Sequence, residues 1–135
     1  MSLYQADDDA GEVAGRGLLA SQRFVPGGFF LGWLLENNLA GRHAAPLGPS
    51  FVARELTGAE VFARVGGALD RMTIGDHAYP FAESYVHRAA DGLFADMAEW
   101  FPLPSIFDVR DTWHNYEWMR IKLVERYSMW RTATG

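Results

Sequence analysis

Cysteine is missing altogether from the 135 residues of the chain. Its absence excludes disulfide scaffolds, thiolate zinc sites, iron–sulfur clusters and cysteine nucleophiles. Lysine is nearly missing as well, because eleven of the twelve basic residues are Arg. Lys122 is therefore the only side chain that could form a Schiff base with a carbonyl substrate.

Long apolar segments are also missing. The longest run, residues 29–35, is interrupted by Gly32 and is far shorter than the roughly 20 residues that a membrane-spanning helix needs. Three consecutive Asp residues, 7–9, stand where a secretory signal would have basic and apolar residues. We therefore expect a soluble cytoplasmic protein without membrane contact. Residues 1–3 are left out of this reasoning, because such a start is typical of an expression leader.

Positive charge is scarce and scattered. Acidic residues outnumber basic ones by 17 to 12, which gives a net charge of −5. Phosphate backbones are bound by clusters of Lys and Arg. The densest basic stretch here, residues 120–131, instead follows Glu117 and contains Glu125. That spacing is typical of an ion-paired helix face. We expect no nucleic-acid partner, and the negative charge would favour a basic protein partner.

Apolar and aromatic side chains are abundant, at 49% and 14% of the residues. A chain of this length can bury a core without a metal or a disulfide. Residues 1–23 hold one aromatic residue, Tyr4, so we expect a loosely ordered N-terminal arm there and a single helical domain over residues 24–135. The apolar spacing predicts a mainly α fold: a small single-domain helical bundle of four to six helices with little or no strand.

Several local signals mark where helices begin and end. Residues 28–40 are apolar almost all round a helix, which predicts a buried central helix with Gly41 as its left-handed cap. Thr57 stands three residues before Glu60, which is the signature of a capping box at the start of another helix. Residues 105–109 alternate between polar and apolar side chains and predict a short extended segment.

The last helix, predicted over residues 112–131 with Asp111 as its N-cap, has apolar residues on two faces. One broad stripe is typical of a core-facing side and consists of Trp113, Tyr116, Met119, Leu123, Val124, Tyr127 and Trp130. Trp118, Ile121 and Met129 lie on the opposite side, among charged residues. Either other segments cover both faces, or these three residues bind a protein partner or a second copy, because apolar anchors ringed by charge are typical of interface centres.

Glu83, His87 and Asp91 are spaced by four residues and could ligate a metal ion from one helix face. The helix predicted over residues 80–90 has its apolar stripe on the other side, and Asp91 could lie beyond the helix end. We therefore expect a solvated trio with side-chain pairing along the helix, and we predict no metal site and no cofactor.

A ligand pocket is the alternative to a protein-binding surface. Aromatic side chains with a few convergent polar groups are typical of such pockets, and the candidates are Trp33, Asn37, Asp111, Trp113, His114 and Tyr116. Asn37 could instead satisfy a helix end, and His114 could be an ordinary surface residue. No hydrolase, metalloprotease or phosphate-binding motif is present, so catalytic residues are not identified.

Three segments resemble an uncharacterised bacterial family of small acidic proteins, a domain of unknown function. The first matches "GxFLxWxLxNxL" at residues 28–39, the second "R-x-x-T-G-x-x-x-F" at residues 54–62, and the third "L-P-S-x-[YF]-x-V-x-D-T-W-x-N-[YF]" at residues 103–116. An acidic stretch typical of the family is weakened at residues 67–72. The resemblance implies a small, mainly helical domain without an established activity, and similar small acidic proteins are often immunity-type partners.

Taken together, these patterns predict a non-enzymatic cytoplasmic protein-interaction domain, of which an immunity-like role is one form. The alternative is a small-molecule-binding protein or a cryptic enzyme with an aromatic-lined pocket.

Overall fold

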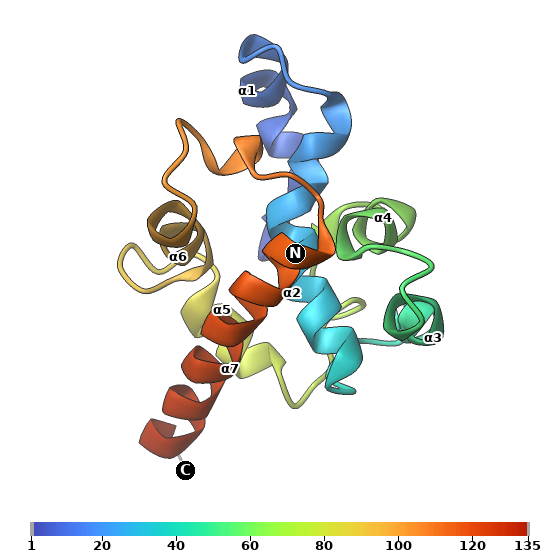
Figure 1. Ribbon diagram of the computed structural model, residues 1–135. Coiled ribbons are helices and arrows are strands. Elements are labelled where there is room, and N and C mark those ends of the chain that lie inside the picture. The colour runs from blue at the N-terminus through green and yellow to red at the C-terminus, as the bar shows by residue number, and fades with distance from the viewer. Residues whose placement is uncertain (1, 135) are drawn as a thin grey trace.

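The computed structural model describes residues 2–134 (Figure 1). Within this range the chain is mainly helical, as predicted, with seven α-helices and one two-stranded sheet. The helices outnumber the four to six expected because two short helices, α1 and α3, with six and five residues, add to the five longer ones. The elements are β1 (Tyr4–Gln5), α1 (Ala10–Gly15), α2 (Val25–Glu36), α3 (Gly48–Val52), α4 (Gly58–Arg64), β2 (Ala68–Leu69), α5 (Tyr79–Tyr85), α6 (Leu93–Trp100) and α7 (Trp113–Thr134), with short 3-10 helices at Ala6–Asp9, Ala20–Phe24, Ala45–Leu47 and Ile106–Asp108.

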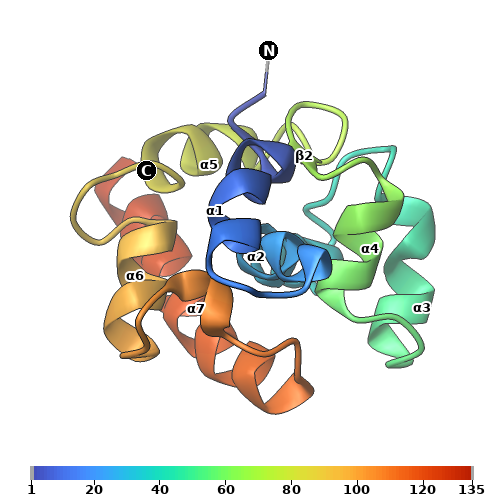
Figure 2. The same cartoon turned by 90° about the horizontal axis from the view of Figure 1, so that it is seen from above.

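Helix α2 lies at the centre of the fold, with α3 and α4 on one side and α6 and α7 on the other (Figure 2). All its residues from Val25 to Leu35 are buried, which confirms the predicted central position, although the helix spans residues 25–36 rather than 28–40. The left-handed residue after it is Asn38, with a φ of 57°, rather than Gly41. Asn tolerates this conformation, and Gly41 instead lies against the backbone of Met72, where an added Cβ would be 2.6 Å from the carbonyl oxygen.

Glycines let other segments approach α2 closely. A Cβ added at Gly28 would lie 2.5 Å from the backbone nitrogen of Ala59, and one added at Gly58 would lie 2.1 Å from the carbonyl oxygen of Gly28. Helices α2 and α4 therefore meet backbone to backbone. The start of α4 is fixed by the predicted capping box, in which the Glu60 N–H donates to Thr57 Oγ1 at 3.2 Å and the Thr57 N–H donates to Glu60 Oε1 at 2.9 Å.

The N-terminal segment is packed on the body rather than loosely held. Tyr4, Ala6 and Val13 are buried, and β1 pairs antiparallel with β2, Tyr4 opposite Leu69. The Gln22 amide donates to the carbonyls of Phe107 and Val109, at 2.8 and 2.9 Å. The three buried side chains point inward although Leu19 of the same segment is exposed, and backbone pairing with distant residues secures the segment.

A buried ion pair joins the helices of the second half. Asp96 on α6 is fully buried and accepts two hydrogen bonds from Arg126 on α7, both at 3.0 Å. The Tyr85 hydroxyl on α5 donates to the same carboxylate at 2.8 Å, and burial raises the pKa of Tyr85. Breaking such a pair by removing one partner costs about 3–5 kcal/mol, because the other charge is left uncompensated.

The segment before α7 differs from the prediction. Residues 106–108 form a 3-10 turn instead of an extended piece, because Ser105 Oγ accepts from the Phe107 N–H at 3.1 Å and caps that turn. Asp111 is not the N-cap of α7; Thr112 Oγ1 accepts from the Asn115 N–H at 3.1 Å in that role.

Within residues 2–134 we find no helix both long and apolar enough to cross a membrane.

Replacing Gly28 with Ala tests the close crossing of α2 and α4. The added methyl group would overlap the α4 backbone, so we expect the Gly28→Ala variant to lose about 1–3 kcal/mol of unfolding free energy in urea denaturation. Gly11→Ala in α1 is the matched control, because nothing lies within 4 Å of an added Cβ there. The control should be neutral or slightly stabilised, and equal stability of the two variants would contradict the crossing.

Candidate functional site

The residues expected to line an aromatic pocket are divided between two parts of the core. Trp33 is buried against Phe30, Phe81 and Tyr127, with centroid distances of 5.9, 5.9 and 5.2 Å. Its indole N–H has no hydrogen-bond partner among residues 2–134. The ring of Tyr127 lies nearly perpendicular to it, at 71°, so Trp33 serves as a core residue packed by aromatic edges.

Trp113 and Tyr116 pack elsewhere, around Phe51. Their centroids lie 5.1 and 5.2 Å from that ring, and the Arg54 guanidinium lies 4.6 Å above Trp113. The Tyr116 hydroxyl donates to Glu36, and burial, followed by this hydrogen bond, raises its pKa.

The polar members of the expected pocket also have other partners. The Asn37 amide donates to the Trp33 carbonyl at 2.8 Å and so satisfies the end of α2. Asp111 accepts from the Thr57 hydroxyl at 2.6 Å. Of the six expected pocket residues, only His114 lines either of the two hollows described below.

Glu83, His87 and Asp91 do not share a helix face, because α5 ends at Tyr85. The His87 ring nitrogen contacts the Leu3 carbonyl, and Asp91 pairs with Arg126 at 3.1 Å. In the described part of the chain, no three His, Cys, Asp or Glu side chains are placed to hold a metal ion.

The outer face of α7 is apolar and exposed. Trp118, Ile121 and Met129 are there, as expected, with Val124 beside them, and the four side chains are 48–57% exposed. Val124 was expected in the core stripe, but its side chain is exposed. It points about 100° around the helix axis from the buried Leu123, which takes it off the side of α7 that packs on the core. We call these four residues the outer face.

Lys122, in the same turn of α7, is buried although Val124 is exposed. Its ammonium lies 5.1 Å from the Trp100 ring centroid and 3.8 Å from Glu125. The stem therefore covers apolar surface while the charge keeps a partner.

A tryptophan hollow of about 470 Å³ lies beside the outer face. Trp118 meets Trp100 of α6 edge to face, with centroids 5.6 Å apart, and its indole N–H donates to His114 Nε2 at 3.2 Å. Trp118 is therefore held in place although it is half-exposed. The hollow is lined by Glu99, Trp100, Phe101, His114, Asn115 and Trp118.

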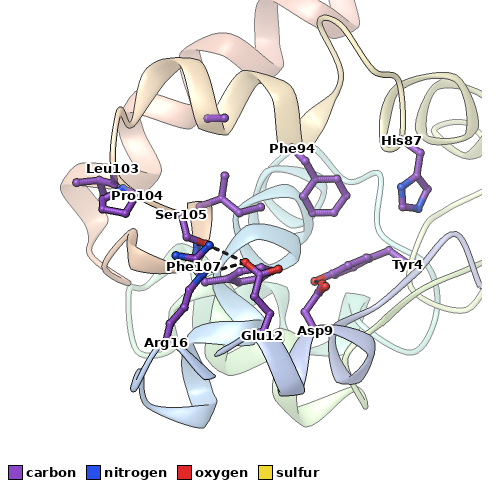
Figure 3. Close-up of a pocket in the computed structure, with 12 residues that line it drawn as sticks. Tyr4, Asp9, Glu12, Arg16, His87, Phe94, Leu103, Pro104, Ser105 and Phe107 are labelled. Carbon is purple, nitrogen blue, oxygen red and sulfur yellow. Dashed lines mark hydrogen bonds and ion pairs between the residues drawn. The ribbon is translucent and has the colours of Figure 1, made fainter. Parts of the chain in front are cut away.

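A second hollow, the N-terminal groove, has a volume of about 500 Å³ (Figure 3). One wall comes from the N-terminal segment and the other from α6 and the turn after it. Its lining consists of Tyr4, Asp9, Glu12, Arg16, His87, Phe94, Ala98, Leu103, Pro104, Ser105, Ile106 and Phe107. The sequence pattern did not predict this groove, because the low aromatic content of residues 1–23 indicated a loose arm. The signal available was the single aromatic residue of that arm, Tyr4.

Polar contacts shape the groove. The Tyr4 hydroxyl donates to Asp9 at 2.7 Å. Arg16 Nε donates to Glu12 at 3.1 Å, and the Ser105 hydroxyl donates to the same oxygen at 3.4 Å. Burial, and after it the Asp9 hydrogen bond, raises the pKa of Tyr4, so this hydroxyl stays protonated and holds the Asp9 carboxylate in place.

Asp111 gives a pH-dependent prediction. Burial raises its pKa above the ordinary value of 3.8, against the lowering effect of the Thr57 hydrogen bond. The folded state therefore binds this proton more tightly than the unfolded state, and the wild type loses stability as pH rises through that window. Asp111→Asn keeps an acceptor for Thr57 without the charge. We expect its stability relative to wild type, measured by urea denaturation, to be greater at pH 7 than at pH 3.8. A difference independent of pH would contradict this.

Comparison of the chain with protein-family models, with curated proteins and with solved structures finds no match in any of the three.

Proposed function

We propose that this chain is a non-enzymatic protein-interaction module that pairs with a second copy of itself through the outer face of α7. The observation that carries the proposal is the line of four apolar side chains, 48–57% exposed, along one helix. Among residues 2–134, three other large apolar side chains are exposed, Leu19, Val52 and Leu103, but they lie singly on separate segments. Single exposed apolar residues are normal on a protein surface, whereas four of them on one side of a single helix need a reason.

The dimensions of α7 suit a helix-to-helix contact. It has 22 residues, which gives a length of about 33 Å. Its last turns extend beyond the rest of the chain (Figure 1), and residues 131–134 are exposed. A second helix could therefore lie along these last turns without meeting the body of the protein.

An antiparallel two-fold pairing centred near Leu123 would make the outer face self-complementary. It would set Trp118 of one copy opposite Met129 of the other, because the two residues are equally far from the centre. In the same register Ile121 and Val124 of the two copies would lie about 3 Å apart along the axis, within one helical turn of each other, so that all four apolar residues are used. A closed two-fold contact of this kind buries the same patch on both copies.

Charges flanking the outer face suit the same register. Glu117 lies near the start of α7 and Arg131 near its end, so antiparallel pairing would bring opposite charges together, whereas parallel pairing would oppose like charges. Opposite charges at a rim fix the register more than they add affinity.

The tryptophan hollow supports the choice of Met129 as the group that meets Trp118. Methionine is flexible and its thioether makes favourable contacts with aromatic rings. Trp100 and Trp118 present such rings, whose planes are inclined at 64° to each other. Met129 of the second copy could therefore pack at the edge of this hollow.

Net charge opposes the pairing. Two chains of net charge −5 repel each other, and salt screens that repulsion. We therefore expect association to strengthen with ionic strength, which is the opposite of binding to a basic partner.

We also propose that the protein works in the cytoplasm, on the ground that it has no cysteine and so does not depend on an oxidising compartment.

Replacing an outer-face residue with Glu tests the pairing. We expect the wild type to sediment as a dimer in analytical ultracentrifugation, and Trp118→Glu and Ile121→Glu to shift it to monomer, because a buried unpaired charge is costly at an interface. Val52→Glu is the matched control, since Val52 is an exposed apolar residue away from α7. A monomeric wild type, or equal dissociation of the control, would overturn the proposal.

Single cysteines test the orientation, since the chain has none of its own. In the antiparallel register, residues 117 of the two copies lie about 20 Å apart along the axis, and so do residues 131. We expect a short bismaleimide to join Glu117→Cys to Arg131→Cys when the two variants are mixed. Either variant alone should stay uncross-linked, whereas self-cross-linking of each would indicate a parallel pair.

A further inference from the structure

We propose that the N-terminal groove binds a small cationic ligand, a primary amine joined to an apolar body about the size of one ring. The site is separate from the proposed pairing surface, because no residue of α7 lines it. It therefore adds a ligand to the function proposed above and does not depend on it.

The size of the groove fits a small molecule. Its volume of about 500 Å³ lies within the roughly 300–1,000 Å³ typical of ligand pockets. Such pockets are lined mainly by apolar groups with a few polar groups that fix orientation. Here the apolar wall consists of Phe94, Ala98, Leu103, Pro104, Ile106 and Phe107.

The opposite wall offers carboxylates. Asp9 and Glu12 point from the N-terminal ribbon toward the space below Phe94 (Figure 3). Within residues 2–134 no cation pairs with Asp9, whose Oδ2 accepts only from Tyr4. Both contacts of Glu12, with Arg16 and Ser105, use Oε2, so Oε1 has no partner in the described chain. An ammonium has three donors and can satisfy both remaining oxygens.

Electrostatics favour a cation over an anion at this site. The charges of Asp8, Asp9 and Glu12 each raise the pKa of Tyr4, in addition to the larger effect of burial. Three carboxylates therefore act together at the Tyr4 end of the groove. Arg16 is the one Lys or Arg side chain in the lining, and it is already paired with Glu12.

Aromatic rings lie where the ligand body would rest. The Phe94 centroid is 5.0 Å from that of Tyr4 and 5.7 Å from that of His87. The ring of Phe94 stands above the two carboxylates (Figure 3). A ligand with its ammonium on the acidic wall would thus place its apolar part against Phe94, and aromatic faces also attract cations.

Three probes of one shape test the ligand class: 2-phenylethylamine, 2-phenylethanol and phenylacetate. Each is titrated into the full chain and followed by amide chemical shifts in two-dimensional NMR. We expect the amine to saturate with shifts confined to the groove residues. The alcohol should bind about tenfold more weakly, because it lacks charged hydrogen bonds, and phenylacetate should not bind. Equal binding of amine and phenylacetate, no binding of the amine, or shifts elsewhere would overturn the proposal.

Variants of the acidic wall identify the groups responsible. Asp9→Asn and Glu12→Gln should each weaken amine binding about tenfold and leave alcohol binding unchanged, with an unchanged circular dichroism spectrum. Glu83→Gln is the matched control, because Glu83 is exposed on α5 and outside the lining. If Glu83→Gln weakened binding as much, the amine would be responding to net charge alone and the site would be refuted.

Discussion

The contact between the backbones of Gly28 and Gly58 is the constraint on which the rest of the fold depends. Helix α2 is buried on every side, and α3, α4, α6 and α7 all pack against it. A side chain at either glycine would push α4 away and open the core around Phe62. The glycines cost helix propensity, and the close packing that they permit offsets this cost. The fold therefore consists of one central buried helix surrounded by the other helices, and not of a bundle of equivalent helices (Figure 2).

Helix α7 packs against this central helix with one side and exposes apolar residues on the other. Its inner side is fully used: Tyr116, Met119 and Leu123 pack into the core, and Arg126 satisfies the buried Asp96. That ion pair also fixes how α7 is turned about its own axis, because a bidentate contact with a guanidinium tolerates little rotation. The outer face is thus directed away from the core by this polar contact together with the burial of the inner apolar side chains. Its four exposed apolar residues cannot turn inward without breaking the Asp96–Arg126 pair.

Local chemistry made part of this structure predictable. The all-round apolar pattern predicted the burial of α2, and the Thr57–Glu60 spacing predicted the start of α4, since both signals lie within one turn or one helix. Tyr4 was misjudged because its burial depends on Leu69 and Phe94, which are distant in the sequence. Trp33 and Trp113 were expected to share a pocket because aromatic type says nothing about location; in fact they pack around different partners. The spacing of apolar residues along the sequence could therefore not predict the groove, which is formed by segments far apart in the chain. The same spacing did identify three of the four outer-face residues.

The two surfaces rest on different kinds of stability. The outer face belongs to a long helix tied into the core, so its geometry exists whether or not a second chain is bound. The groove exists only while the N-terminal segment is closed against α6, through the Tyr4 packing, the two-residue sheet and the Gln22 hydrogen bonds. A ligand that bridges both walls must favour that closed arrangement by mass action, because it binds the open one less well. Binding in the groove would therefore stabilise residues 2–23, and α7, which contributes nothing to the lining, would remain free to pair.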